Sequence, residues 1–349
     1  MGGFLKQDKH RAPLLLMANR SGYSLARKIH QELQKKLEVE LRLPEVNEFA
    51  CGEFKVSLGT GKNETVRGKD VYLIQCPIDK TSIRTIQDNI WETLLTIDTL
   101  KNCHARHTTV VIPCMPYVRQ DKRDGREPLS ALVMAKVLAA AGADAVITLD
   151  PHFSQLKGYF EAVGVLPDIL YPTHSFIQYI KQRYGLANLV ILAPDPGAAK
   201  RAVFYADHLF GEGHLHDRVV FTTKKRSVAN QVDFLTIQGE VKGKTVLITD
   251  DMIDTAGTMQ KVIHHTLELG ARQIIACCTH PILSGSAIAR LDELYEQGGF
   301  AELLTSDTVV HPDGFQEQHR WFNQISVAPI LAEFILRINQ EKETSSLYL

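Results

Sequence analysis

Short runs of Val, Ile and Leu alternate with longer amphipathic stretches along almost the whole chain. Continuous apolar runs, rather than strict alternation of apolar and polar residues, are typical of parallel strands that are covered on both faces. The predicted strands are Leu14–Met17, Val71–Cys76, Val110–Cys114, Ala145–Leu149, Leu189–Ala193, Val246–Thr249 and Ile274–Cys278. The predicted helices are Ser24–Lys36, Ile86–Thr99, Ser130–Ala141, Ala198–His208 and Met259–Leu269. This alternation predicts an α/β fold with doubly wound parallel sheets.

A weak internal repeat indicates two domains of the same kind. Twice, a strand, an Asp-bearing loop and a helix are followed by a Gly-Ala pair and a further strand; the pairs are Gly142-Ala143 and Gly270-Ala271. A helix that ends at Gly before a strand is common in any α/β fold, but two in matching order favour two similar domains. The length of 349 residues also exceeds what one core usually supports. We therefore expect domains at residues 1–170 and 171–335.

Composition narrows the class of protein. The chain has 39 Lys+Arg and 40 Asp+Glu, a formal net charge of -1, which argues against nucleic acid or an anionic membrane as the main partner. No apolar stretch approaches the roughly 20 residues that span a bilayer. The six cysteines show no CxxC spacing, so we expect buried thiols in a reducing compartment rather than disulfides or a zinc site. These features predict a cytoplasmic globular protein.

The clearest candidate for chemistry is a segment where a predicted strand runs into paired carboxylates, a small-residue loop and a helix. Its residues are Asp250, Asp251, Asp254, Thr255, Ala256, Gly257 and Thr258. A loop between a parallel strand and a helix presents free N–H groups that suit a phosphate monoester, and the two Thr hydroxyls add donors. Asp250 and Asp251 are suited to accept hydrogen bonds from vicinal sugar hydroxyls. The segment thus suggests a sugar phosphate, although an acidic turn that caps a helix remains open.

The same segment resembles the phosphoribosyl-pyrophosphate-binding motif of type I phosphoribosyltransferases and of ribose-phosphate diphosphokinases. Four further segments resemble the diphosphokinases alone: PYVRQDKRDGREPLSA (Pro116–Ala131), LDPHFSQLKGYF (Leu149–Phe160), APDPGAAKRA (Ala193–Ala202) and KKRSVANQVD (Lys224–Asp233). They occur in that family's order, and the likeness covers nearly the whole chain. The chain is identified as a member of the ribose-phosphate diphosphokinase (phosphoribosyl-pyrophosphate synthetase) family.

This resemblance implies a fold, a reaction and partners. The fold has two doubly wound domains of the type I phosphoribosyltransferase kind, with ATP on the first, ribose 5-phosphate on the second, and the tail 336–349 returning to the first. The reaction is Mg²⁺-dependent transfer of the diphosphoryl group of ATP to the C1 hydroxyl of ribose 5-phosphate. Its products are 5-phosphoribosyl 1-pyrophosphate and AMP, for nucleotide biosynthesis. The family also suggests inorganic phosphate as an activator and a homo-oligomer, expected to be a hexamer.

Site residues follow from the resemblance one by one. It implies catalytic roles for Lys224 and Arg226, ATP contacts for Phe49, Cys51, Gly52, Glu53, Arg119 and Gln120, and metal binding for His152 and Asp195. Taken alone, the basic run 224–226 also fits a solvated surface cluster, and a His after a strand also fits a structural role. Cys51 departs from the family, which usually has Asp or Asn there.

Two other functions remain to be weighed. A non-catalytic regulatory subunit associated with the diphosphokinase would explain Cys51 and the extra residues in 57–66. A phosphoribosyltransferase that consumes phosphoribosyl pyrophosphate would explain the loop 250–258, but neither Arg119-Gln120 nor the basic run 224–226. The retained basic run favours the active diphosphokinase.

Overall fold

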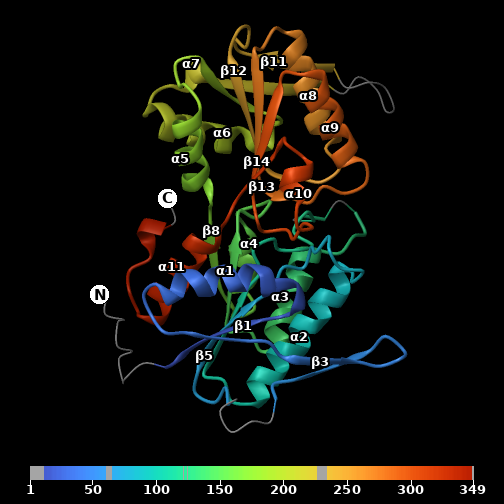
Figure 1. The fold of residues 1–349 in the computed structure, drawn as a ribbon, viewed down its shortest axis with the longest axis vertical. Coiled ribbons are helices and arrows are strands. Elements are labelled where there is room, and N and C mark those ends of the chain that lie inside the picture. Colours follow the sequence, from blue (N-terminus) through green and yellow to red (C-terminus); the bar gives the residue numbers. More distant parts are fainter. Residues whose placement is uncertain (1–11, 60–64, 121, 124, 226–233, 348–349) are drawn as a thin grey trace. The chain divides into compact units, whose positions relative to one another are not determined.

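The computed structural model describes residues 12–59, 65–120, 122, 123, 125–225 and 234–347. Figure 1 shows the fold, which divides into two compact units. The first comprises Met1–Tyr171, Thr308–His311 and Ser326–Leu349, and the second comprises Pro172–Asp307 and Pro312–Ile325. Each unit is built on one parallel-dominated sheet with helices on both faces, so the predicted doubly wound α/β class is confirmed. No helix among the described residues is long and apolar enough to cross a membrane.

The first unit has a six-stranded sheet in the order β2-β1-β5-β6-β7-β8, and all its pairs are parallel. The strands are β1 (Leu14–Ala18), β2 (Glu40–Arg42), β5 (Asp70–Ile74), β6 (His107–Val111), β7 (Ala145–Leu149) and β8 (Leu166–Leu170). A separate antiparallel hairpin is formed by β3 (Glu45–Glu48) and β4 (Phe54–Ser57). The helices are α1 (Tyr23–Gln34), α2 (Ile86–Asn102), α3 (Ser130–Ala141), α4 (Leu156–Glu161) and α11 (Ala328–Asn339), with short 3-10 turns η1 (Arg20–Gly22) and η3 (Ser345–Leu347).

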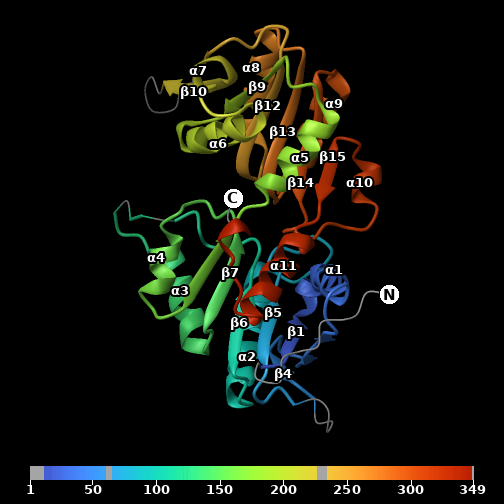
Figure 2. The same ribbon diagram turned by 90° about the vertical axis from the view of Figure 1, so that its left-hand side faces the viewer.

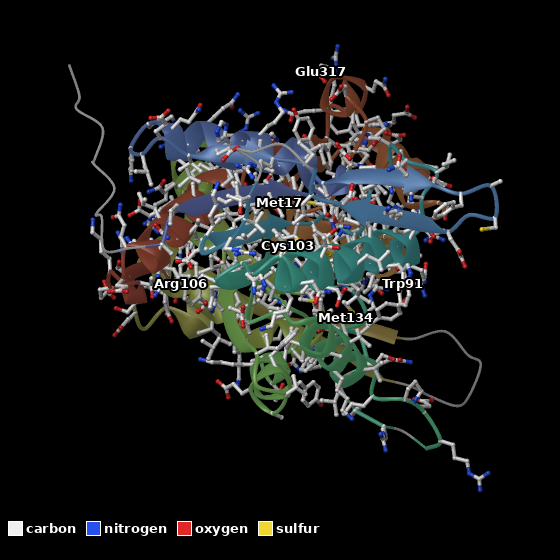
Figure 3. All side chains as sticks on the ribbon, turned by 90° about the horizontal axis from the view of Figure 1, so that it is seen from below. Met17, Trp91, Cys103, Arg106, Met134 and Glu317 are labelled. Carbon is white, nitrogen blue, oxygen red and sulfur yellow. The ribbon has the colours of Figure 1, made fainter. Side chains whose placement is uncertain are left out.

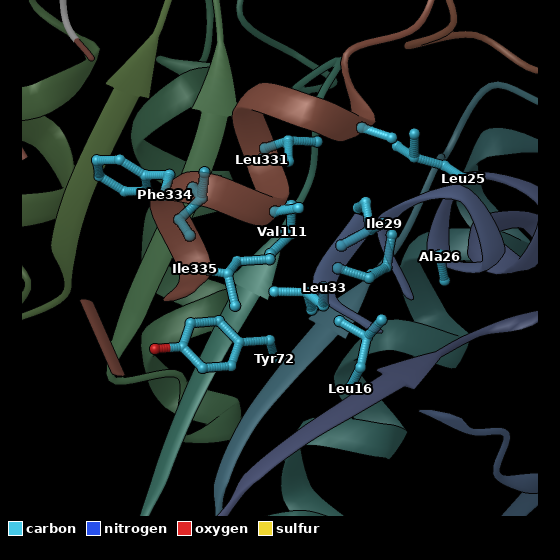
Figure 4. Close-up of a cluster of buried hydrophobic side chains, with 14 of the residues drawn as sticks. Leu16, Leu25, Ala26, Ile29, Leu33, Tyr72, Val111, Leu331, Phe334 and Ile335 are labelled. Atoms are coloured by element: carbon cyan, nitrogen blue, oxygen red, sulfur yellow. The ribbon is translucent and has the colours of Figure 1, made fainter. Parts of the chain in front are cut away.

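Two helices from opposite ends of the chain cover one face of this sheet. Figures 1 and 2 show α11 beside α1, and their apolar side chains form a single buried cluster with β1, β5 and β6. Figure 4 shows Ile29 and Leu33 of α1 facing Leu331 and Ile335 of α11 over Tyr72. The other face is covered by α2, α3 and α4. There Met134 is buried while Trp91 on the outer side of α2 is exposed (Figure 3).

The second unit has a seven-stranded sheet in the order β11-β10-β9-β12-β13-β14-β15. Only the edge pair β10–β11 is antiparallel among its described pairs. The strands are β9 (Leu189–Ala193), β10 (Val219–Lys225), β11 (Phe234–Gln238), β12 (Thr245–Ile253), β13 (Gln273–Pro281), β14 (Phe300–Ser306) and β15 (Phe322–Ile325). The helices are α5 (Thr173–Arg183), α6 (Ala199–Phe210), α7 (Leu215–Arg218), α8 (Gly257–Glu268), α9 (Ala287–Gln297) and α10 (Phe315–Gln318), with the 3-10 turn η2 (Pro196–Ala198). Helices α5 and α6 pack on one face, and α8 and α9 on the other.

Two sequence-based expectations are corrected by the sheet topology. The strand expected at Val110–Cys114 is β6, at His107–Val111, because the buried Thr108 and Thr109 continue the strand and the apolar run at its end is a buried loop. The internal repeat matched β6–α3–β7 with β12–α8–β13. By position in the sheets, however, β12 corresponds to β5, since each lies directly beside the first long strand of its unit, β9 or β1. The repeat therefore reflects the common ending of a helix at Gly before a strand, and its two copies do not occupy equivalent positions in the two sheets.

Candidate active site

The sheet order of the second unit creates a topological switch point between β9 and β12. The chain leaves β9 for η2 and α6 on one face of the sheet, and leaves β12 for α8 on the other. Because both strands are parallel, both connections leave from the same edge, and such a switch point is where open α/β sheets bind ligands. The predicted residues Asp195, Asp250 and Asp251 and the loop 254–258 all lie at this edge.

Three carboxylates influence one another there. Asp250 and Asp251 are near the end of β12, and the Asp251 backbone N–H donates to Asp250 Oδ1 at 2.9 Å. Burial raises the pKa of Asp250 well above its usual range, and the side-chain hydrogen bond and charge of Asp251 and the charge of Asp195 raise it further, while the bond from the Asp251 backbone N–H lowers it. The Asp195 carboxylate caps η2 by accepting from the Ala198 N–H at 3.1 Å. This concentration of negative charge suits hydroxyl donors or a cation.

Hydrogen bonds to the backbone carbonyls of residues 253–255 fix the start of the loop from Asp254 to Thr258. The carbonyl of Ile253 accepts from the backbone N–H of Leu283 at 3.0 Å, and that of Asp254 accepts from the N–H of Ser284 at 2.8 Å. The next carbonyl, of Thr255, accepts from Arg290 Nη1 at 2.6 Å. Three successive peptide groups thus have their carbonyls directed to the segment after β13 and to α9.

The loop then turns directly into a helix. Ala256 adopts a left-handed conformation with φ 59°, and Gly257 begins α8, with Thr258 in its first turn. Ala256 provides no side-chain cap, so the first N–H groups of α8 have no capping side chain from that position. Free N–H groups and the positive end of the helix dipole form an arrangement that can bind an anion.

The donors at this edge could hold a metal ion only through a few protein ligands. Mg²⁺ takes oxygen ligands, usually one or two carboxylates with several waters. The oxygen donors of Asp195, Asp250 and Asp251 are of that kind. Within the described ranges, no three His, Cys, Asp or Glu side chains converge as a metal cage. The residues therefore fit an ion that is held largely by water and substrate oxygens.

The predicted catalytic pair is described in part. Lys224 is the penultimate residue of β10, which pairs with β9 through Phe221 and Ala193. Its backbone therefore lies at the same edge of the sheet as Asp195. Arg226 lies outside the described residues.

The predicted adenine segment forms the tip of the β3–β4 hairpin in the first unit. Phe49, Cys51, Gly52 and Glu53 are all exposed, and the tip is closed by a 2.7 Å hydrogen bond from the Phe49 N–H to the Glu53 carbonyl. Two guanidinium groups lie over the ring of the adjacent Phe54, those of Arg20 at 5.7 Å and Arg84 at 5.3 Å from its centroid. Arg20 follows β1, so the hairpin is anchored near the carboxyl edge of that sheet.

The remaining predicted residues follow β6 and β7, which are paired neighbours. Arg119 and Gln120 lie in the connection after β6, and both are exposed, with the Ser130 hydroxyl hydrogen-bonded to the Gln120 side chain. His152 is exposed two residues after the buried Asp150, whose φ of 39° turns the chain sharply at the end of β7. The predicted residues thus fall into two groups, each at the carboxyl edge of its own sheet.

Sequence reasoning missed Arg290. It lies 32 residues beyond Thr258, on a helix that was not predicted, and its guanidinium contacts the loop through a backbone carbonyl. No local pattern links a side chain to a distant carbonyl. The one available signal was an Arg one turn into the helix after β13.

Comparison with known proteins assigns the family. Residues 14–142 match the model of the N-terminal domain of ribose phosphate pyrophosphokinase, and residues 173–296 match the phosphoribosyl transferase domain. A ribose-phosphate pyrophosphokinase of Clostridium perfringens is 34% identical over 345 residues, covering 98% of this chain and 99% of that protein. One from Wolinella succinogenes is 36% identical over 319 residues, covering 91% and 94%.

A solved structure agrees over both units. The crystal structure of a phosphoribosylpyrophosphate synthetase from Mycobacterium smegmatis superimposes with a TM-score of 0.80 at 32% identity, covering 94% of this chain and 99% of that one. The family model, the relatives and the structure all support the resemblance inferred from the sequence motifs. The chain belongs to the ribose-phosphate pyrophosphokinase family, whose members are also called ribose-phosphate diphosphokinases, and it is an enzyme of that family.

Proposed function

We propose that this chain transfers the diphosphoryl group of ATP to the C1 hydroxyl of ribose 5-phosphate, giving 5-phosphoribosyl 1-pyrophosphate and AMP. The observation that carries the proposal is the edge of the second sheet, where an uncapped helix N-terminus lies beside a pair of aspartates. One part suits a phosphate, and the other suits vicinal hydroxyls. A phosphorylated sugar carries both groups in one molecule.

In this proposal the sugar is bound before any bond changes. The N–H groups and hydroxyls of residues 254–258 bind the 5-phosphate, while Asp250 and Asp251 accept hydrogen bonds from the ring hydroxyls. The C1 oxygen then attacks the β-phosphorus of ATP, the bond from that phosphorus to the α,β-bridging oxygen breaks, and the hydroxyl proton is released. Lys224 and Arg226 stabilise the charge on the transferring group, because such transfers depend on positioning and cations rather than on covalent catalysis.

ATP is assigned to the first unit. Arg119 and Gln120 would contact the nucleotide, and Phe49 would stack on adenine beside Cys51, Gly52 and Glu53. His152 of the first unit and Asp195 of the second would be Mg²⁺ ligands. Bound Mg²⁺ would supply positive charge to the phosphate oxygens. A homo-oligomer, regulation by inorganic phosphate and a cytoplasmic location are part of the same proposal.

The alternative is a non-catalytic regulatory subunit of the same family. Cys51 favours it, because a thiol is a weak donor and acceptor compared with the Asp or Asn expected at an adenine-contacting position. Lys224 and the residues 250–258 favour the enzyme, since a subunit without activity would not need them together.

The test is AMP release from ATP and Mg²⁺, with and without ribose 5-phosphate, over a range of phosphate concentrations. We expect AMP and 5-phosphoribosyl 1-pyrophosphate in equal amounts, and only with the sugar phosphate present. A folded protein that binds ribose 5-phosphate but releases no AMP at any phosphate concentration would favour the regulatory subunit.

A further inference from the structure

We propose that Arg290 is a positioning residue that gives this site its preference for a phosphorylated sugar. It would do so by fixing the orientation of the loop 254–258 and by placing a positive charge beside it. The inference rests on the proposed function and adds a residue to it that lies on a separate helix. Three observations carry the argument: a contact, a peptide geometry and an unpaired charge.

The guanidinium of Arg290 lies against the loop 254–258 at two places, Thr255 and Gly257. Arg290 Nη1 is 2.6 Å from the Thr255 carbonyl oxygen. It also lies 3.2 Å from where a Cβ on Gly257 would stand, so it closely approaches the first residue of α8. The helix that carries it is fixed in the core through Ala287 and Leu291, which are fully buried.

Because the peptide bond is planar, the contact between Arg290 and the Thr255 carbonyl also fixes the direction of the next backbone N–H. In a trans peptide the carbonyl and the next N–H point in opposite directions. Because Arg290 draws the Thr255 carbonyl toward α9, the N–H of Ala256 must point away from α9. The neighbouring bonds from Leu283 and Ser284 orient the two preceding peptides in the same way. The contact with Arg290 therefore directs the N–H of Ala256 to the opposite side of the loop, beside the N-terminus of α8, where N–H groups can bind an anion.

The charge of Arg290 is not neutralised by a carboxylate. Among the residues that the structure describes, its guanidinium is in no ion pair, whereas Arg20 pairs with Glu92 and Arg337 with Glu333. An unpaired guanidinium beside a loop favours an anion there over a neutral group. A sugar without phosphate would gain nothing from it.

The competing explanation is that Arg290 only ties α9 to the loop. A purely structural tie would affect all ligands of the site alike. A role in selecting phosphate would affect ribose 5-phosphate and spare ribose, which presents the same ring hydroxyls. The ratio of the two dissociation constants separates these explanations.

The experiment measures binding of ribose 5-phosphate by calorimetry and of ribose by ligand-detected NMR to the full chain. Arg290→Gln should weaken ribose 5-phosphate binding about 10- to 100-fold, since it removes both a charge beside the loop and a hydrogen bond from a charged donor, and should change ribose binding less than twofold. Arg290→Lys should recover part of the loss, since it keeps the charge but not the planar fork. The matched control is Lys261→Gln on the exposed side of α8, which removes an equal charge and should leave both constants unchanged.

A second measurement tests the packing itself. Gly257→Ala places a methyl group 3.2 Å from Nη1, so it should weaken ribose 5-phosphate binding several-fold in the wild type and less in the Arg290→Gln background. Equal effects in both backgrounds would overturn the contact.

The outcomes distinguish the inference from the proposed function. A wild type that releases AMP normally, together with an Arg290→Gln variant that binds ribose 5-phosphate within twofold of it, overturns the inference alone. Equal loss of ribose and ribose 5-phosphate in that variant also overturns it, in favour of the structural tie. A wild type that binds no ribose 5-phosphate overturns both.

Discussion

The two sheets order their parallel strands in the same way but carry different side chains at their carboxyl edges. In each unit the first long strand, β1 or β9, leads into a 3-10 turn and a helix beside the next strand of the sheet. In the first unit the charge at this point is compensated within the protein: Glu92 pairs with Arg20, and the Asn19 side chain accepts from the Thr96 hydroxyl at 2.9 Å. In the second unit burial raises the pKa of Asp250, and the neighbouring Asp251 and Asp195 raise it further.

The difference shows that topology provides a switch point but does not by itself make it a binding site. Both sheets have the switch point at which doubly wound proteins bind ligands. In the first unit side chains of α2 fill it, and the candidate ATP residues lie on the hairpin and on the loops after β6 and β7 instead. In the second unit three carboxylates and the loop before α8 lie at this point. Four substitutions test this contrast, from the largest expected effect to the smallest.

Lys224→Ala should have the largest effect. If the second edge holds the transferring group, losing this cation should lower kcat about 10³-fold and leave the dissociation constant of ribose 5-phosphate within about twofold. Steady-state AMP release and calorimetry measure the two quantities. Lys181→Ala, an exposed lysine of α5, is the control. Normal turnover in the Lys224 variant would remove the basic run from the mechanism.

Gly22→Ala should destabilise the first unit by about 2–3 kcal/mol. Its φ of -85° suits any residue, but an added Cβ would lie 2.1 Å from the Ile74 carbonyl oxygen. The packing of η1 against the end of β5 leaves no room for that methyl group. Gly158→Ala is the control, because nothing lies within 4 Å of a Cβ there. Hydrogen exchange of peptides from each unit would locate the loss, and equal protection in both variants would show that α1 can move away from β5.

Some features of this structure could be predicted from the sequence, and others, such as the packing of Gly22, could not. The α/β class, most long helices and strands, and the loop 250–258 follow from periodicity and motif, since these are local patterns. The close approach of Gly22 to Ile74, the pairing of Arg20 with Glu92 and the contact of Arg290 with Thr255 do not, because each joins segments far apart in the chain. The equivalence of β5 and β12 was missed for the same reason, since strand order is a property of the sheet.

Glu92→Gln should destabilise the first unit by about 2 kcal/mol. The Glu92 side chain is 1% exposed. It accepts hydrogen bonds from Arg20 Nε at 2.9 Å and from the Arg20 backbone N–H at 3.1 Å. An amide keeps one acceptor and turns an N–H₂ group toward the guanidinium, which leaves the cation without its counter-charge. The figure is below the 3–5 kcal/mol of a fully buried pair because the Arg20 side chain is 35% exposed. Urea unfolding measures the change, and an unchanged midpoint would mean that solvent compensates Arg20 fully.

The equivalent exchange in the second unit, Asp250→Asn, should have the opposite sign. Removing a buried charge beside Asp251 and Asp195 should stabilise the protein by about 1 kcal/mol at neutral pH without Mg²⁺, while it weakens ribose 5-phosphate binding. The pH dependence identifies the cause. An unfolded Asp titrates near pH 3.9, and the folded pKa of Asp250 is higher, so the wild type loses stability as pH rises from about 4 through that folded pKa.

The variant lacks this loss, because an amide does not titrate. The difference in unfolding free energy between variant and wild type should therefore be near zero well below the unfolded pKa of Asp, where Asp250 is protonated in both states, and should grow toward neutral pH. Urea unfolding in EDTA at several pH values measures it, and added Mg²⁺ should reduce it if the carboxylates attract the ion. A destabilised Asp250→Asn at neutral pH would mean that the carboxylate is satisfied within the protein, as Glu92 is. The second edge would then resemble the first, and the case for a sugar phosphate at Asp250 would fail with the contrast.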